Sequence, residues 1–284
     1  MTWMLLVLIY GLLKGAREIV KKKSLEKCSV MEVLFFYTLF AFLLVMPDVG
    51  NALDVNIEKL PFVALKSFVI FIAWILSFKA IKKMPISLYG ILDLSRVLFA
   101  TILGLVVMKE QPSFEQMMGL VLVATGLFML KKKKAEPEKV EAKIVLFALL
   151  SCVLNAVSGL FDKILTKSIT SSQLQFWYML FLVLFYLLYL IFDKTKVDIK
   201  KSVKNYWILI LAILFVIADR ALFMANAMPE SKITIMTLIK QSGCLVTILA
   251  GKFIYKEKNI RHKLFCAVVI VTGIVVAVLD LGVF

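Results

Sequence analysis

Long apolar segments recur along nearly the whole chain and constrain its fold more than any other feature of the sequence. Ten of them can be drawn, and most approach the roughly 20 residues that a helix needs to cross a hydrocarbon core. Hydrophobic residues make up 62% of the chain, so water cannot be its main solvent. Backbone polar groups in lipid must be satisfied internally, and apolar runs without alternation indicate helices rather than a barrel. The sequence therefore predicts an all-α integral membrane protein with ten transmembrane helices.

The segments divide into two halves, residues 1–130 and 143–284, joined by a charged linker at residues 131–142. The first segment covers residues 2–13, with its helix continuing towards Val20. The others cover residues 30–46, 60–81, 86–108, 114–130, 143–161, 173–192, 206–226, 232–253 and 263–284. We expect each half to be one five-helix unit.

The second half repeats a long stretch of the first. Met84-Pro85 opens the first copy and Met228-Pro229 opens the second, each before a long apolar segment. Adding 147 to a residue number gives its partner in five pairs: Ser95 and Ser242, Gly104 and Gly251, Lys109 and Lys256, Glu110 and Glu257, Gly126 and Gly273. Internal duplication in an apolar chain is common in secondary transporters, which hold their solute between the repeats.

The two halves are expected to insert in opposite senses, because five crossings reverse the side on which the second half starts. Lysine and arginine crowd the first and third loops of the first half, but the second and fourth loops of the second half. On these boundaries the first loop contains Lys14, Arg17, Lys21, Lys22, Lys23 and Lys27. The sequence thus predicts two inverted repeats, and the positive-inside rule places both termini outside the cell.

Several motifs resemble those of the EamA family of the drug/metabolite transporter superfamily, over nearly the whole chain. They are Lys79-Ala80 before Met84-Pro85, Lys109-Glu110, Gly119, Gly126, Pro229, Lys256-Glu257 and Gly273. Cys266 departs from the pattern, because it stands where the first repeat has Gly119. The resemblance implies a central cavity and a solute among amino acids, other metabolites, nucleotide sugars or drugs. It also implies cytoplasmic termini, in conflict with the loop charges.

Charged residues inside the apolar segments mark a candidate site, since a charge at the centre of a membrane helix costs roughly 2.5 to 3.5 kcal/mol. Asp93 and Arg96 are three residues apart and share a helix face. The offset of 147 pairs Asp93 with Lys240, so opposite charges occupy equivalent places in the repeats. The candidate substrate-binding residues are Tyr89, Asp93, Arg96, Asn155, Arg220, Lys240 and Gln241. The candidates for ion coupling are Asp93 and Asp219.

Structural interpretations stay open beside this one. Asp93 can pair with Arg96 or Lys240 without any solute, because buried ion pairs often serve structure alone. Asn155 can link two helices through a hydrogen bond, and Lys14 can extend to the membrane surface.

Composition argues against several other classes of protein. The net charge of +15 comes from lysines between the apolar segments, which fits lipid headgroups better than nucleic acid. The four cysteines show no close pairing and His262 is the single histidine, so we expect no metal site. No glycine loop for ATP phosphates is present. We expect no cofactor, and no catalytic set of residues indicates an enzyme.

The main prediction is a multi-pass protein of the cell membrane that moves a small polar solute by alternating access, with export as the expected direction. A zwitterion such as an amino acid would bind Asp93 at one end and Arg96 and Lys240 at the other. The first alternative is an anionic sugar phosphate or nucleotide sugar, held by Lys240, Arg96 and Arg220. The second is a non-transporting membrane scaffold. The expected partners are the solute and the lipid bilayer, and a homodimer is an open alternative.

Overall fold

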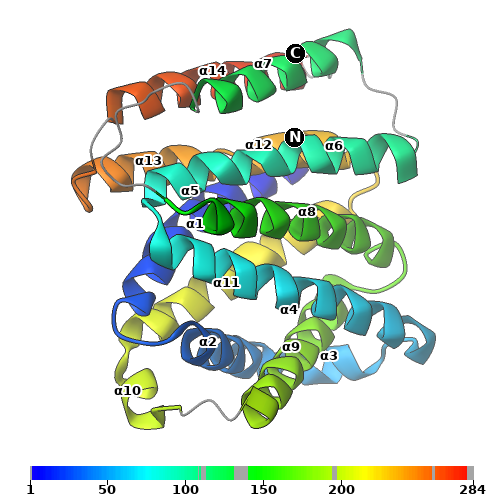
Figure 1. Ribbon diagram of the computed structural model, residues 1–284. Helices are drawn as coiled ribbons and strands as arrows, with labels where there is room; N and C mark the ends of the chain where they lie inside the picture. Colours follow the sequence, from blue (N-terminus) through cyan, green and yellow to red (C-terminus); the bar gives the residue numbers. More distant parts are fainter. Residues whose placement is uncertain are drawn as a thin grey trace.

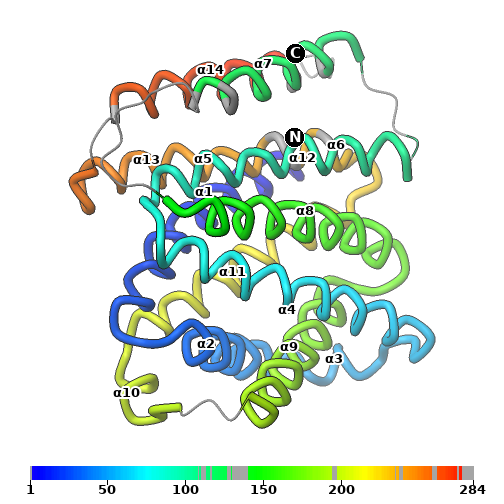
Figure 2. Tube along the Cα trace, viewed as in Figure 1, coloured from blue at the N-terminus to red at the C-terminus, as the bar shows by residue number. Residues whose placement is uncertain are grey.

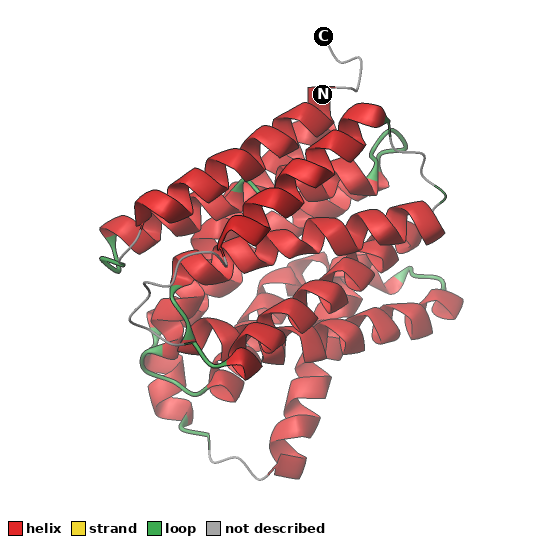
Figure 3. Ribbon diagram, turned by 45° about the horizontal axis from the view of Figure 1, so that its top comes forward, coloured by secondary structure: helices red, strands yellow, loops and turns green. Residues whose placement is uncertain are grey.

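A computed structural model of the protein describes residues 2–107, 109, 113–130, 140–193, 197–257 and 260–279. Regular structure in these ranges is entirely helical, as Figure 3 shows. Glu110 and residues 131–139 of the expected linker lie outside the described residues.

The described residues of the first half form seven α-helices, of which α3 and α5 are short. They are α1 (Thr2–Leu25), α2 (Val30–Val45), α3 (Val49–Leu53), α4 (Leu60–Lys83), α5 (Ile86–Leu92), α6 (Arg96–Val107) and α7 (Phe114–Leu130). Single 3-10 turns, η1 (Met46–Asp48), η2 (Ile57–Lys59) and η3 (Asp93–Ser95), connect some of them.

The second half follows the same plan. Its helices are α8 (Ala142–Leu165), α9 (Ser171–Asp193), α10 (Ile199–Lys204), α11 (Tyr206–Ala227), α12 (Ile233–Lys240), α13 (Gly243–Phe253) and α14 (Ile260–Leu279). Among the described residues, six spans are long and apolar enough to cross a membrane unaided. They are Val30–Leu53, Ile57–Lys83, Ile86–Val107, Ala142–Leu165, Ser171–Asp193 and Tyr206–Ala227. Shorter apolar helices cover Met117–Gly126 and Gly243–Phe253.

The contacts between helices are symmetric: when each helix of a contact is replaced by its equivalent in the other repeat, the result is again an observed contact. Helix α1 packs on α11 as α8 packs on α4, and α6 packs on α8 as α13 packs on α1. Likewise α5 packs on α13 as α12 packs on α6. Two helices contact their own equivalents: α2 contacts α9, and α7 contacts α14. Figures 1 and 2 show α7 and α14 side by side as an outer layer over α5, α6, α12 and α13. The two halves are therefore related by an approximate two-fold axis. Because each half crosses the membrane an odd number of times, they are inverted repeats.

The Met-Pro pairs end one helix and begin the next in both repeats. Met84 has an extended backbone, as a residue before proline prefers, so α4 stops there and α5 starts after Pro85. The Lys22 amino group donates a hydrogen bond of 2.8 Å to the Met84 carbonyl oxygen. Lys163 donates in the same way to Met228, at 3.3 Å. Each repeat thus closes its Met-Pro turn with a lysine from the end of its own first helix.

The repeats also share an unusual backbone conformation after α6 and α13. Lys109 and Lys256, which are 147 residues apart, have φ angles of 54° and 50°. L-residues other than glycine rarely adopt this left-handed conformation, because the Cβ atom approaches the following carbonyl oxygen. The same strained turn at equivalent positions shows that the duplication extends to backbone geometry.

Glycines bring α1 against the junction between α12 and α13. A Cβ atom added to Gly243 would lie 2.5 Å from the Gly11 carbonyl oxygen, and one added to Gly15 would lie 2.5 Å from the Gly243 carbonyl oxygen. No other residue fits here without moving backbone, so these glycines determine how closely the repeats approach each other.

Candidate functional site

A cavity lies between the repeats, with about 900 Å³ of space free of protein atoms, including space open to solvent. Four helices, α1, α4, α8 and α11, each contribute one face to its wall, and α5, α6, α9 and α12 contribute the rest. The lining residues of α4, Lys66, Ile70, Trp74 and Ser77, recur every three or four positions. Helical periodicity therefore turns one face of α4, with both polar and apolar side chains, towards the cavity.

Helix α1 contributes the most charged face, and here the sequence analysis was wrong. Lys14, Arg17 and Lys21 were assigned to a loop, but α1 continues to Leu25 and buries all three. Together with Tyr10 and Glu18 they line the cavity. Positions 10, 14, 17, 18 and 21 have the three- and four-residue spacing of one helix face, and this signal could have identified them.

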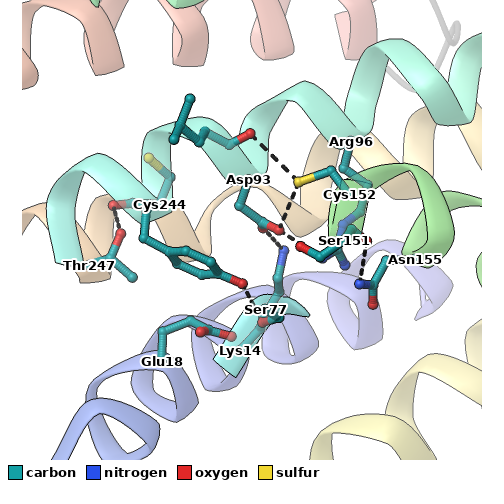
Figure 4. Close-up of polar contacts among 12 residues, drawn as sticks. Lys14, Glu18, Ser77, Asp93, Arg96, Ser151, Cys152, Asn155, Cys244 and Thr247 are labelled. Atoms are coloured by element: carbon teal, nitrogen blue, oxygen red, sulfur yellow. Dashed lines mark hydrogen bonds and ion pairs between the residues drawn. The ribbon is translucent and has the colours of Figure 1, made fainter. Parts of the chain in front are cut away.

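Asp93 lies at the centre of an ion-pair cluster that joins the first and fourth segments. Its carboxylate pairs with the Lys14 amino group from α1 and, at 2.7 Å, with the Arg96 guanidinium. The thiol of Cys152 on α8 donates to the same carboxylate at 3.8 Å. Figure 4 shows Asp93 between these side chains. The predicted pairing of Asp93 with Arg96 is confirmed, whereas the alternative pair of Asp93 with Lys240 is absent from the described contacts.

Three further ion pairs lie on the cavity wall. Arg17 pairs with Asp219 at 3.2 Å, and Lys21 pairs with Glu18 at 2.7 Å. Lys66 pairs with Asp162 at 3.1 Å and lies 3.4 Å from the centre of the Tyr178 ring. The first and third of these pairs connect the two repeats, so burying these charges also ties the halves together.

Sequence reasoning missed Lys66, although its signal was clear. It is the one lysine near the middle of the apolar segment at residues 60–81, and its side chain is 2% exposed. An isolated charge within a membrane helix is a functional candidate by default. The carboxylate that neutralises it, Asp162, is on α8 and could not be identified without the fold.

Lys240 differs from the other cations of the cavity wall. It lies 5.7 Å from the centre of the Tyr10 ring, which is a favourable cation–π distance. No carboxylate of the described residues lies within ion-pair distance of its amino group. Lys240 therefore presents a positive charge to the cavity that the described part of the chain does not directly neutralise.

The remaining predicted residues divide into two groups. Tyr89 and Asn155 line the cavity, with Tyr89 bonded to Ser77 at 2.6 Å. Gln241 is buried but does not line it. Arg220 also lies outside the cavity wall, because its guanidinium turns towards η1 and pairs with Asp48 at 3.0 Å.

Both helices that carry the predicted charges are interrupted at those charges. The turn η3 at Asp93–Ser95 separates α5 from α6, and α12 ends at Lys240 before α13 starts at Gly243. Discontinuous helices near mid-membrane, arranged symmetrically in two inverted repeats, are typical of solute sites in secondary transporters. The cavity, its charges and these interruptions coincide.

Comparison with known proteins agrees with this arrangement. The sequence model of the EamA-like transporter family matches residues 1–131 and 142–279. The chain belongs to this family. Among curated proteins none matches it. Solved structures give 28 matching chains. One of these, described only as the crystal structure of a protein, shares 14% sequence identity with a TM-score of 0.72, over 98% of this chain and 96% of that chain. At such low identity, this likeness shows the fold alone.

Membership of the EamA-like family settles the class of the protein. It is a multi-pass membrane transporter with a small-molecule substrate, and not an enzyme. Two EamA units imply about ten crossings, in agreement with the ten segments drawn from the sequence.

Proposed function

We propose that this EamA protein moves a small charged or polar solute by alternating access through the cavity between its repeats. The observation that carries the proposal is the coincidence of a buried, charged cavity with two symmetry-related helix interruptions. A scaffold would gain nothing from Lys240, whose half-buried charge faces the cavity with no carboxylate of the described residues within ion-pair distance.

Inverted repeats offer a simple route between two states. If each repeat adopts the conformation of the other, the cavity closes at one end and opens at the other. Contacts between repeats at the ends of the cavity must then break and form in turn.

Glu257 makes one such contact between repeats. It follows α13 and accepts hydrogen bonds from the backbone N–H groups of Ile86 and Ser87, at 2.7 and 3.3 Å, which begin α5. Tyr255 lies beside it, and its hydroxyl donates to the Ile19 carbonyl oxygen at 3.5 Å. Burial raises the pKa of Tyr255 to about 12, so this hydroxyl stays protonated at physiological pH. We propose that the Glu257 contact is released in each transport cycle.

We propose that the protein lies in the cell membrane and exports its solute. A homodimer stays a prediction. Flux measured with solute gradients of either orientation tests the direction.

A blocked cavity tests the route. Gly159 lines the cavity, and a Cβ atom added there meets nothing within 4 Å. Gly50 has equally open surroundings but is exposed on α3. Gly159→Trp should abolish solute flux in proteoliposomes while Gly50→Trp leaves it unchanged, with both variants folded. Normal flux through folded Gly159→Trp would contradict the proposed route.

A further inference from the structure

The charges on the cavity wall do not balance. Among its described lining residues there are six cations: Lys14, Arg17, Lys21, Lys66, Arg96 and Lys240. Three carboxylates line the same cavity, Glu18, Asp162 and Asp219, and Asp93 adds a fourth from the adjoining pocket. Six cations against four carboxylates leave two positive charges.

The excess is localised rather than spread over the wall. Arg17, Lys21 and Lys66 each have a carboxylate of their own. Lys14 and Arg96 share the single carboxylate of Asp93, which leaves one positive charge there. The second belongs to Lys240, which packs beside Tyr10, one helical turn from Lys14 on α1. Both uncompensated charges therefore lie where the two interrupted helices meet α1.

Solutes of opposite charge would meet very different conditions in this cavity. Each of the four carboxylates already has a cationic partner, so an ammonium group would have to share a carboxylate with that cation on a wall of net positive charge. An anion can approach Lys240 and the Lys14–Arg96 pair without breaking any ion pair. The Nε atom of Arg96 has no hydrogen-bond partner among the described residues, so Arg96 has a donor available. The Oδ1 atom of Asp162 also lacks one, but it lies 3.1 Å from the Lys66 amino group, which neutralises it. In a site of low dielectric constant, this difference between the binding of an anion and that of a cation is large.

We infer that the substrate is a small organic anion with about two negative charges, either a phosphate monoester or a dicarboxylate. The inference rests on the proposed function and adds the substrate class to it. The anionic group of the solute binds Lys240 and Arg96, and Asp93 holds Arg96 and Lys14 in position for it. Neutral amino acids fit less well, because their ammonium group finds no unpaired carboxylate.

Uptake from defined mixtures tests the inference. Proteoliposomes with purified protein are given three mixtures in turn, and mass spectrometry identifies the solutes that accumulate. The anionic mixture contains succinate, malate, glycerol 3-phosphate, 3-phosphoglycerate and glucose 6-phosphate. The second contains the neutral amino acids, and the cationic one contains putrescine, spermidine, lysine and arginine. We expect accumulation from the anionic mixture, and which members accumulate separates phosphate monoesters from dicarboxylates.

Variants at Lys240 connect the result to the site. Lys240→Gln should lower the initial rate of anion uptake roughly tenfold or more, since a charge-assisted hydrogen bond is lost. Lys240→Arg should retain most of the initial rate of anion uptake. Lys252→Gln removes the same charge from an exposed position on α13 and should leave uptake unchanged.

The outcomes separate the two proposals. Accumulation from the amino-acid or cationic mixture instead would overturn the anionic substrate and leave transport standing. Accumulation of anions with a normal rate in folded Lys240→Gln would overturn the assigned site. Failure of wild-type protein to accumulate any solute from the three mixtures would count against the proposed transport function itself.

Discussion

Asp93 and Lys240 occupy equivalent positions in the two repeats, and each lies where its helix is interrupted. They do not pair with each other. Asp93 is held by Lys14 and Arg96, whereas Lys240 faces the cavity beside Tyr10. Duplication thus supplied two similar helix breaks, and different residues at them gave the two repeats unlike roles: one carries a neutralised cluster and the other an available charge.

Removal of the Asp93 carboxylate should be costly. In Asp93→Asn both Lys14 and Arg96 lose their buried counter-charge, so the free energy of unfolding should fall by roughly 3 to 5 kcal/mol. Lys14→Met should cost less, because Arg96 continues to neutralise Asp93. Thermal unfolding in detergent, followed by tryptophan fluorescence, measures both. Equal destabilisation by the two variants would show that Asp93 does not bridge the two cations.

Gly243, at the contact between the repeats, and Gly159, on the cavity wall, should respond in opposite ways to substitution by alanine. Gly243→Ala places a Cβ atom 2.5 Å from the Gly11 carbonyl oxygen and should destabilise the protein by roughly 1 to 3 kcal/mol. Gly159→Ala meets open space within α8 and should stabilise it by up to about 1 kcal/mol through helix propensity. The comparison uses melting temperatures of the purified variants. A stable Gly243→Ala protein would show that α1 is not in close contact with the α12–α13 junction.

The left-handed lysines should be improved by glycine. Lys256 has φ of 50°, where an L-residue costs roughly 1 to 2 kcal/mol relative to glycine. Lys256→Gly should therefore raise stability, and Lys256→Val should lower it, because a β-branched side chain tolerates this conformation worst. Lys109→Gly, at the equivalent turn, should act in the same direction as Lys256→Gly. Lower melting temperatures for both glycine variants would contradict the backbone conformation.

The contact from Glu257 to the start of α5 should behave as a helix cap. Glu257→Ala leaves the N–H groups of Ile86 and Ser87 without their acceptor and should cost about 0.5 to 2 kcal/mol. Glu26 provides a control, because its side chain is 51% exposed and pairs with Lys23 at 3.4 Å. Glu26→Ala should change stability by no more than about 1 kcal/mol. Similar losses in both variants would remove the case for a cap.

The structure changes which charges support the predicted orientation in the membrane, but not the orientation itself. Lys14, Arg17 and Lys21 belong to the cavity wall and do not count as loop charges. The remaining basic loops still favour the same side, so we predict that both termini lie outside the cytoplasm. A reporter fused to the C-terminus, active only in the cytoplasm, should stay inactive. Reporter activity would show that the loop charges do not determine insertion in this chain.

Much of the fold followed from periodicity and length. The eighth segment drawn at residues 206–226 became α11 (Tyr206–Ala227), and the fifth matched α7 (Phe114–Leu130). The first segment, drawn at residues 2–13 with its helix continuing towards Val20, was too short for α1 (Thr2–Leu25), because hydropathy alone ends a segment where charges begin. Lys14 and Arg17 are neutralised by Asp93 and Asp219 on distant segments, which the local sequence does not reveal. Lys21 is neutralised by Glu18, three residues before it on the same helix.

The candidate site was foreseen in part for the same reason. Asp93 and Arg96 are three residues apart, so their pairing was local and predictable. Arg220 was expected beside them, but its direction on α11 depends on Asp48, 172 residues away in the chain. The partnership of Lys66 with Asp162 is equally non-local. Periodicity identifies which residues share a face, and only tertiary packing decides what that face meets.

Access to the cavity from both sides of the membrane is the most direct measurement of the central claim. Ser158 on α8 lines the cavity and is 3% exposed, while the four native cysteines are buried. A Ser158→Cys variant in oriented vesicles is treated with a membrane-impermeant maleimide from one side or the other, with wild-type protein as background. Alternating access predicts labelling from both sides, each slowed by transported solute. Labelling from one side only, under solute gradients of either direction, would contradict it.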